Sequence, residues 1–280
     1  MRALCLRGDG STLWRRVSSR SLKGCRRFVT PCTSTCSACP AHRFSEGIEA
    51  VVLELSDTVS EARPAATAIL VRFTDKSAEV LLLKRNETLQ HMPGLWVFPG
   101  GKVEPDDPGE GALEQARHGA ARELQEEAGV SLSPAALSPF SHWLTPVVVK
   151  RRFSTWFFLA EVDDDTPVTV DGSEITAHQW WRPSEALAAH HRGDLPLTPP
   201  TLVSLHALQS LEASRDAWTA LASRPPVHFF PNVVREAEAM IFLYEGDACY
   251  ESGDLTLQGS VHRTVGKGGL FYYEPLSEGA

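Results

Sequence analysis

The sequence predicts an α/β fold, because strand-sized apolar runs and helical patterns both occur between residue 64 and the end of the chain. Short runs of β-branched residues and leucine, separated by polar turns, indicate strands. A longer segment with small apolar residues on one side and acids on the other indicates an amphipathic helix. The chain is 42% hydrophobic and 22% charged, which is ordinary for a soluble globular protein. No segment approaches the roughly 18 to 20 consecutive apolar residues that a membrane span requires.

The expected elements begin with a hairpin of residues 66–73 and 80–83, which the polar turn 74–78 connects. A third strand at 95–98 runs into Pro99-Gly100-Gly101, a turn in which glycine can adopt positive φ and let the backbone approach a ligand. A helix over 112–128 stops at Gly129, a good left-handed cap residue. Strands follow at 140–145, 153–162 and 175–181, helices at 183–191 and 199–221, and further strands at 239–244, 260–265 and 270–273. Thr198 is the expected N-cap of the helix that starts at Pro199.

Positive charge is concentrated at the start of the chain. Residues 1–45 contain nine Lys and Arg but a single acid, Asp9, so the remainder carries 18 basic and 34 acidic residues. The net charge of that remainder is −16, against −8 for the whole chain. Such a surface repels a long nucleic acid, so a small anionic substrate held by a metal ion is the better expectation.

The first 46 residues differ in composition from the rest. They are rich in Arg and Ser and poor in acids, as in a mitochondrial transit peptide, a disordered tail or a wrongly assigned start. Five of the six cysteines lie there, which argues against a disulfide scaffold in the body. We expect a basic segment at 1–46, a main domain at 47–192 and a helical and β extension at 193–280. The expected location is cytoplasmic, or mitochondrial if 1–46 is a transit peptide.

The segment from Arg122 to Val130 carries the chemistry. A helical step of about 100° per residue puts Glu123, Glu126 and Glu127 within roughly a 100° arc. The adjoining arc is small or apolar and can pack on a sheet while the acidic edge faces a cleft. Oxygen ligands of this kind suit Mg²⁺ or Mn²⁺. A solvated acidic helix face is the alternative, but the preceding Pro-Gly-Gly turn and the closing Ala-Gly-Val favour a phosphate and metal site.

These residues resemble the Nudix box, which is glycine, five residues, Glu, seven residues, then Arg-Glu-aliphatic-x-Glu-Glu-x-Gly-aliphatic. The second half matches from Glu114 through Arg122 to Val130. In the first half, twelve residues separate Gly101 from Glu114, which corresponds to an insertion of seven in the loop 102–113. Counting forward from Gly101 assigns the first acid to Asp107, whereas counting back from Arg122 assigns it to Glu114.

The resemblance implies a Nudix α/β/α sandwich with a mixed sheet over about residues 64–190. It also implies that Glu123 and Glu127 bind metal, that Glu126 is a ligand or the general base, and that Arg122 orients the ligands. Bridging cations would neutralise a diphosphate and lower the pKa of a bound water, and in-line attack would split the P–O–P linkage. Glu174 and Glu185 are candidates for a base outside the box.

Beyond the box, the chain resembles the coenzyme A diphosphatase-like branch related to the Nudix motif 19 proteins. The similarity spans roughly residues 63–205 and includes Arg63-Pro64-Ala65-Ala66, 81–85, 94–101, Trp143-Leu144-Thr145-Pro146, Arg151-Arg152-Phe153 and 197–201. Arg85 and the run Phe98 to Gly101 fit the pattern of CoA-cleaving Nudix proteins, but Gln90 stands where a second basic residue is expected.

The resemblance favours coenzyme A or acyl-CoA as the substrate, with ADP-ribose or NADH as alternatives. The expected substrate contacts are Arg85, Phe98, Gly100, Gly101 and Arg152. Arg152, with Lys150 and Arg151, could meet the extra phosphate of CoA, although a solvated basic turn is an equal alternative. A Nudix-fold regulatory module without catalysis is the alternative from another class. The sequence indicates no oligomeric state.

Overall fold

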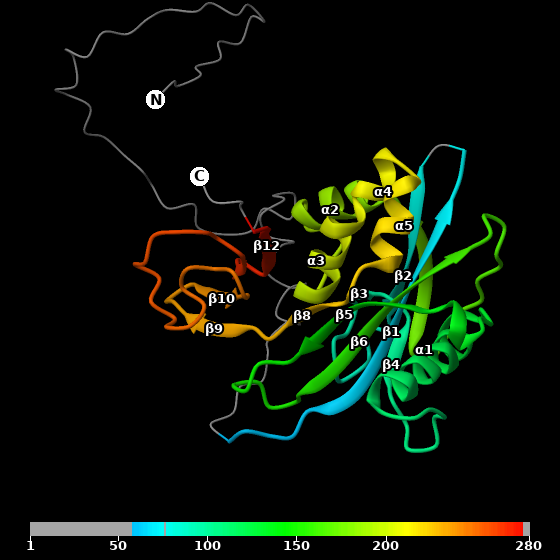
Figure 1. Ribbon diagram of the computed structural model, residues 1–280, viewed down its shortest axis with the longest axis horizontal. Coiled ribbons are helices and arrows are strands. Elements are labelled where there is room, and N and C mark those ends of the chain that lie inside the picture. Colours follow the sequence, from blue (N-terminus) through cyan, green and yellow to red (C-terminus); the bar gives the residue numbers. More distant parts are fainter. Residues whose placement is uncertain (1–57, 76, 277–280) are drawn as a thin grey trace, which may run out of the picture. The chain divides into compact units, whose positions relative to one another are not determined.

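Two long strands, β1 (Arg63–Phe73) and β6 (Phe153–Val162), form the centre of the fold (Figure 1). They run parallel, in a register that extends from Arg63 opposite Phe153 to Arg72 opposite Val162. The computed structural model describes residues 58–75 and 77–276. The predicted basic segment 1–46 and its five cysteines lie outside the described residues.

The central pair belongs to an eight-stranded mixed sheet. Its main order is β3 (Trp96–Val97), β2 (Ala78–Arg85), β1, β6, β5 (Ser138–Leu144) and β8 (Val227–Phe229). Two further strands, β4 (Gly100–Lys102) and β7 (Ile175–Trp181), pair with β1 and β2 respectively. The β1–β6 and β5–β8 pairs are parallel and the others antiparallel. The predicted hairpin is confirmed, with Val71 opposite Val80.

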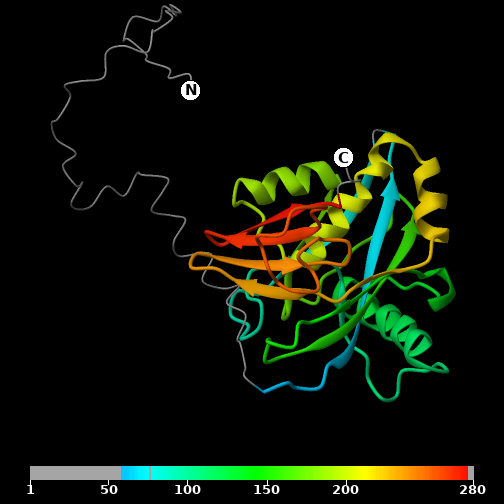
Figure 2. The same ribbon diagram turned by 60° about the vertical axis from the view of Figure 1, so that its left-hand side comes forward.

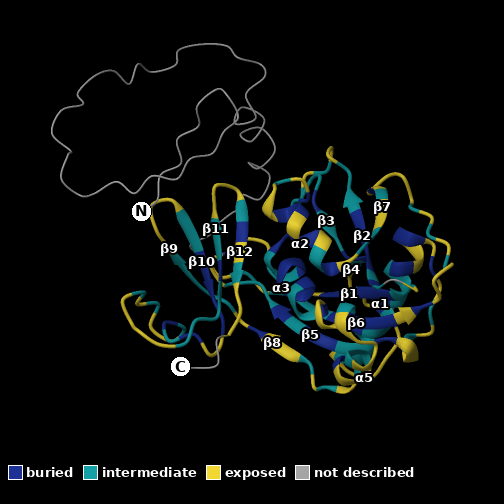
Figure 3. Cartoon of the chain, turned by 90° about the horizontal axis from the view of Figure 1, so that it is seen from above, coloured by how far each residue is buried: buried dark blue, intermediate teal, exposed yellow. Residues whose placement is uncertain are grey.

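Helices cover both faces of this sheet, so β1 is buried on both sides (Figure 3). Because side chains alternate along a strand, Ile69 and Val71 face one core while Ala68 and Leu70 face the other. The helix α1 (Ala112–Ala128), followed by the short 3₁₀ turn η3 (Pro134–Ala136), packs on the second core. The helices on the other face are α2 (Pro183–His191), α3 (Pro199–Leu208), α4 (Ser210–Ala213) and α5 (Asp216–Ser223). The predicted α/β/α sandwich with a mixed sheet is confirmed.

The helix α1 has the predicted bounds. Its apolar side, with Ala116, Ala120, Leu124 and Ala128, is buried against the sheet. The helix ends at Gly129, whose φ of 67° is the left-handed conformation expected of this residue. The packing of this face fixes which side of α1 carries the acids.

The single helix predicted over 199–221 is wrong, because the structure has three helices there. Ser214 is extended, with φ −160° and ψ 133°, and its hydroxyl accepts a hydrogen bond from the backbone N–H of Asp216 at 3.1 Å. The Glu212 carboxylate accepts hydrogen bonds from the backbone N–H and the hydroxyl of Ser184. The Ser214 bond is local and competes with helix continuation, whereas the Glu212 bonds join α4 to the start of α2.

The structure confirms Thr198 as the N-cap residue of α3, although its hydroxyl makes no capping hydrogen bond and lies 3.1 Å from the hydroxyl of Thr201. One local expectation is corrected. The Gly100-Gly101 turn is instead the start of β4, in which Ala66 lies opposite Gly101. A Cβ atom at Gly100 would overlap the carbonyl oxygen of Ala66, so glycine here permits a close approach to β1.

The C-terminal residues form a second sheet of four antiparallel strands (Figure 2). They are β9 (Asn232–Arg235), β10 (Ala239–Leu243), β11 (Arg263–Lys267) and β12 (Leu270–Glu274). Phe242, Tyr244 and Phe271 from this part belong to the same buried cluster as Ile69 of β1. The predicted boundary at residue 192 therefore falls within continuous packing, and β8 from the extension completes the main sheet. Within residues 58–75 and 77–276, no helix has the length and apolar character needed to cross a membrane.

His190 links the two parts. It is 1% exposed, and its two ring nitrogens each lie 2.9 Å from a carbonyl oxygen, one of Leu195 and one of Phe271. The contact with Phe271 joins α2 to β12, 81 residues away in the sequence.

We predict that His190→Ala lowers the free energy of unfolding by about 1–3 kcal/mol, because the neutral ring donates to one of the two buried carbonyl oxygens and the substitution leaves that oxygen without a donor. Urea denaturation at constant pH measures this. The adjacent His191→Ala is the matched control, because His191 is exposed, and its effect should stay within about 0.5 kcal/mol. Equal effects of the two substitutions would contradict a linking role for His190.

Candidate active site

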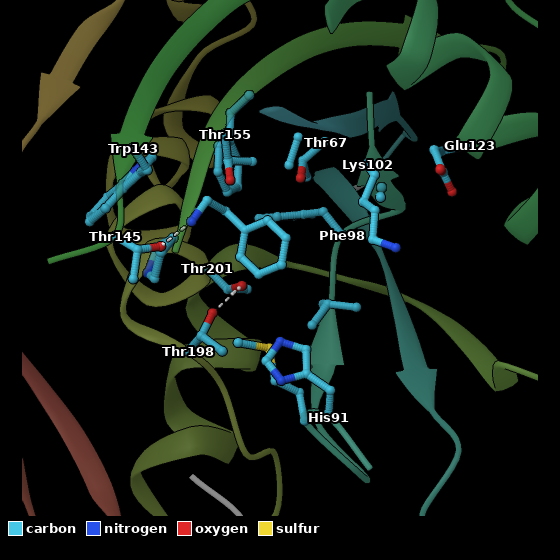
Figure 4. Close-up of a pocket in the computed structure, with 18 of the residues that line it drawn as sticks. Thr67, His91, Phe98, Lys102, Glu123, Trp143, Thr145, Thr155, Thr198 and Thr201 are labelled. Carbon is cyan, nitrogen blue, oxygen red and sulfur yellow. Dashed lines mark hydrogen bonds between the residues drawn. The ribbon is translucent and has the colours of Figure 1, made fainter. Parts of the chain in front are cut away.

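A cavity of about 760 Å³ lies beside the acidic edge of α1 (Figure 4). Its wall includes Gly100 to Lys102 of β4, parts of β5 and β6, the loop before β7, the start of α3 and residues of the C-terminal sheet. Glu123, Glu126 and Glu127 all line it. The structure thus brings the three predicted glutamates to one cavity, although each carboxylate has a different partner.

Glu127 and Glu123 contact the glycine pair of β4. The backbone N–H of Gly100 donates a hydrogen bond of 2.8 Å to Glu127 Oε2. A Cβ atom at Gly101 would overlap the carboxylate of Glu123. Glycine at 100 thus allows β4 to approach β1, and glycine at 101 leaves room for the Glu123 carboxylate of α1, so both carboxylates lie at the cavity wall.

Burial changes the acidity of both groups. Glu127 is 8% exposed, and burial raises its pKa to about 7, with a further rise from the charge of Glu123 and an opposing effect of the Gly100 N–H. Burial also raises the pKa of Glu123, against the hydrogen bond and charge of Arg122. Two adjacent carboxylates that resist ionisation create a place where a cation would be favourable.

Arg122 holds the loop and the helix together. It donates to both carboxylate oxygens of Asp107, at 3.0 and 3.1 Å, and to the carbonyl oxygen of Lys102 at 2.9 Å. Its remaining terminal nitrogen donates to Glu123 at 2.9 Å and to Glu126 at 3.0 Å. Burial opposes ionisation of Asp107, but the hydrogen bonds from Arg122 and from the Glu104 N–H outweigh it and lower the pKa of Asp107. The ordering contact predicted for Arg122 is present in the geometry.

The structure also distinguishes the two candidates for the first acid. Asp107 is buried against Arg122, whereas the Glu114 side chain is 46% exposed and pairs with Arg117 at 3.3 Å. Asp107 is the residue reached by counting forward from Gly101, so the additional loop residues lie between Asp107 and the helix. The pairing supports Asp107 as the first acid of the motif.

The donor set fits a divalent cation that keeps part of its water shell. Within 58–75 and 77–276, no three His, Cys, Asp or Glu side chains are gathered closely enough to hold an ion by themselves. The reason is visible in the contacts, since Arg122 engages Glu123 and Glu126 while Glu127 is directed to Gly100. Mg²⁺ commonly takes one or two carboxylates, several waters and substrate phosphate oxygens. Glu123 and Glu127 match that requirement, and Glu126, whose side chain is 57% exposed, lies at the edge.

Of the two other base candidates, the structure brings one to the cavity. Glu174 lines it, on a loop that Asp171 organises by accepting hydrogen bonds of 2.8 Å from the N–H groups of Glu174 and Ile175. Glu185 does not line the cavity and lies 3.5 Å from Arg182 on α2. The sequence Asp-Gly-Ser-Glu at 171–174 is a turn signal that could have identified this loop.

Four of the five predicted substrate contacts line the cavity: Arg85, Phe98, Gly100 and Gly101. Arg152 does not. It donates instead to the backbone carbonyl oxygens of Thr145 at 3.1 Å and Ser60 at 2.7 Å, and so holds the loop before β6. Lys102, which the sequence did not single out, also lines the cavity.

Sequence reasoning also missed the wall that the C-terminal extension supplies. Residues far apart in the chain meet there, from the start of α3 and from the second sheet: Thr198, Pro199, Pro200, Thr201, Pro231, Phe242, Tyr244 and Phe271. Residues 197–201 belong to the segments that resemble the coenzyme A diphosphatase-like branch, but no local motif indicates that they meet the C-terminal residues, because this proximity arises from tertiary packing.

We predict that Asp107→Ala lowers the free energy of unfolding by about 1–3 kcal/mol, because Arg122 loses both hydrogen bonds of a charged pair. Glu114→Ala should cost less than about 1 kcal/mol, as expected for an exposed pair. Chemical denaturation of both variants tests the assignment of the first acid. A larger loss from Glu114→Ala would favour the count back from Arg122.

Comparison with known proteins identifies the domain. A family model described as NUDIX domain matches residues 62–199. The chain is 28% identical over 193 residues to putative nudix hydrolase 7 of Caenorhabditis elegans, covering 56% of this chain and 64% of that protein. It is 29% identical over 187 residues to acyl-coenzyme A diphosphatase NUDT19 of Homo sapiens, covering 64% of this chain and 49% of that protein. The chain thus spans about half to two thirds of the length of these relatives.

Among solved structures, a NUDIX hydrolase from Alicyclobacillus acidocaldarius has a similar fold. The TM-score is 0.52 at 24% identity, and the match covers 61% of this chain and 100% of the other. At this identity the likeness concerns the fold. The family match shows that residues 62–199 of this chain are a Nudix domain.

Proposed function

We propose that this chain is a metal-dependent diphosphohydrolase that splits the P–O–P linkage of a nucleoside-diphosphate-linked small molecule. The observation that carries the proposal is the placement of Glu123 and Glu127 on one cavity wall, both with raised pKa. Their mutual repulsion and burial are costs that a bound cation would offset. The same cavity is large enough for a nucleotide-sized ligand, because small-molecule sites measure roughly 300–1,000 Å³.

The residues of the motif have distinct roles in this proposal. Glu123 and Glu127, with Glu126 at the edge, hold Mg²⁺ or Mn²⁺, which supplies charge neutralisation of the diphosphate and an activated water. Arg122 is a positioning residue, since it fixes Glu123 and Glu126 relative to the loop. Either Glu126 or Glu174 accepts the proton of the attacking water.

For the substrate we propose coenzyme A or acyl-CoA. The similarity to the human acyl-coenzyme A diphosphatase and the cavity positions of Arg85, Phe98, Gly100 and Gly101 support this choice. Arg85 and Lys102, with Arg122, are the cationic Lys and Arg side chains among the described cavity residues, so they would contact the substrate phosphates. Given its backbone contacts, Arg152 would contribute to phosphate binding only through the field of its charge.

A non-catalytic nucleotide-binding module is the alternative from another class. A protein that only binds a nucleotide gains nothing from buried, mutually repelling carboxylates beside the phosphate site. ADP-ribose and NADH carry the same diphosphate linkage, so the alternatives within the enzyme class differ in the groups attached to it.

We predict that the purified protein with Mg²⁺ or Mn²⁺ cleaves CoA or an acyl-CoA into adenosine 3′,5′-bisphosphate and the phosphopantetheine fragment. Glu127→Gln should lower kcat/KM by at least about 100-fold, because it removes a ligand charge at the reacting centre. Glu114→Gln, on the exposed part of the same helix, is the control and should retain activity. Mass spectrometry of reactions with CoA, octanoyl-CoA, NADH and ADP-ribose reads out the products. The enzymatic proposal fails if none is split, or if Glu127→Gln retains full turnover.

We further predict that Mn²⁺ affinity rises about tenfold between pH 6 and pH 8, because the pKa of Glu127 is about 7 without metal and the cation requires the ionised form. In the metal-free protein, folding stability changes with pH in the opposite direction to metal affinity. The raised pKa of Glu127 stabilises the folded state fully below pH 4.5, and this stabilisation is lost as the pH rises through 7. Calorimetric titration with Mn²⁺ and thermal melts without metal measure the two effects. A metal affinity independent of pH in this range would argue against Glu127 as a ligand.

A further inference from the structure

The two ends of the cavity differ in chemical character. One end carries the charged side chains of the wall, including Glu123, Glu127, Glu174, Arg85 and Lys102. The other end is lined by aromatic, proline and threonine side chains. Figure 4 shows Glu123 and Trp143 on opposite sides of Phe98, so the ring of Phe98 lies between the two ends.

The second end is built largely by the C-terminal extension. It joins Trp143 and Phe157 of the main sheet to the start of α3 and to three aromatic side chains of the extension, which are Phe242, Tyr244 and Phe271. Trp143 and Tyr244 are packed edge to face, with ring centroids 5.7 Å apart, and Phe242 and Phe271 lie 6.0 Å apart. These contacts, with the His190 bond to the Phe271 carbonyl, hold the wall in place.

Four hydroxyl groups at this end make hydrogen bonds within the protein. Tyr244 donates to Thr264 at 2.8 Å, Thr198 and Thr201 lie 3.1 Å apart, and Thr145 accepts from the Phe153 N–H at 3.0 Å. The indole N–H of Trp143 is buried without an acceptor in the described part of the chain. A charged ligand group would lose its water here in exchange for a few neutral donors, whereas a hydrocarbon loses no hydrogen bond and gains contact with the aromatic side chains.

We propose that this end, formed by Trp143, Phe157, Thr201, Phe242, Tyr244 and Phe271, is a chamber for the hydrocarbon chain of an acylated substrate. The inference rests on the proposed diphosphohydrolase function, because the chamber opens into the same cavity as Glu123 and Glu127. A substrate whose diphosphate lies at the glutamates would extend its other end past Phe98 into apolar surroundings. The C-terminal extension is then a specificity-determining part of the site.

The chamber predicts a dependence on chain length in the unmodified protein. Each methylene that leaves water for an apolar wall contributes about 0.8 kcal/mol, which corresponds to about a fourfold change in KM or in Kd. We expect KM to fall along the series CoA, acetyl-, butyryl-, hexanoyl- and octanoyl-CoA, and then to level off once the chamber is filled. Calorimetric titration of the metal-free protein with CoA and octanoyl-CoA tests the same preference without turnover.

Phe271→Ala and the milder Phe271→Leu test the wall itself. Either should reduce the preference for octanoyl-CoA over CoA by about fivefold or more, measured as the ratio of kcat/KM values and as the ratio of Kd values. Tyr272→Ala is the matched control, because Tyr272 is the next residue of β12, is 43% exposed, does not line the cavity and stacks on His191. The control should leave the ratio unchanged.

The outcomes separate the two proposals. Tighter binding of octanoyl-CoA without cleavage of any substrate would support the chamber and overturn the diphosphohydrolase function. Cleavage of CoA with no gain from the acyl chain in KM or Kd would overturn the chamber and leave the function intact. An unchanged ratio in a folded Phe271→Leu protein, alongside a chain-length dependence, would also overturn the assignment of the wall.

Discussion

The guanidinium group of Arg122 is the interaction on which the acidic site depends. Its donors lie in a fixed planar fork, and the structure uses that fork to join the loop after β4 to the helix α1 through Asp107 and the Lys102 carbonyl. The same group lies between Glu123 and Glu126 and reduces their repulsion. A cation that binds Glu123 must compete with Arg122 for that carboxylate. The arginine therefore both orders the ligands and sets how strongly an ion has to attract them.

The close packing of β4 between β1 and α1 is the second constraint, and it explains the two glycines. A side chain at Gly100 would overlap β1, and one at Gly101 would overlap Glu123. The tight contact excludes water from Glu127 and allows the Gly100 N–H to reach its carboxylate. The raised pKa of Glu127 thus follows from backbone packing as much as from charge. A loop with larger residues would separate the helix from the strand and leave the carboxylates in solvent.

The sequence was informative where a pattern is long and local. The helix 112–128 and the strands 153–162 and 175–181 were predicted with their observed bounds, because periodicity and cap residues act within a few turns. Secondary structure was predicted wrongly where a side-chain hydrogen bond determines the backbone conformation, as at Ser214. It was also missed where strands have only three or four residues, as in β4, β8 and β9. The choice between Asp107 and Glu114 needed the fold, because an inserted loop makes spacing ambiguous. Arg152 also needed the fold to be interpreted. Its charge suggested a contact with a substrate phosphate, but its side chain donates hydrogen bonds to backbone carbonyl oxygens.

The cavity combines parts of the chain that carry very different amounts of sequence signal. At the charged end, carboxylates, glycines and an arginine must keep fixed spacings, so the chemistry is readable from a short motif. At the apolar end, any well-packed set of aromatic and aliphatic side chains can form the wall, and residues such as Trp143, Tyr244 and Phe271 meet only through tertiary packing. The Nudix box therefore indicates the kind of bond that is cleaved. The box does not include the residues at the apolar end, which would contact the group attached to the diphosphate. Phe242, Tyr244 and Phe271 of the extension pack in the same core as Ile69 of β1 and also line the cavity, so the cavity wall includes residues from well beyond the motif.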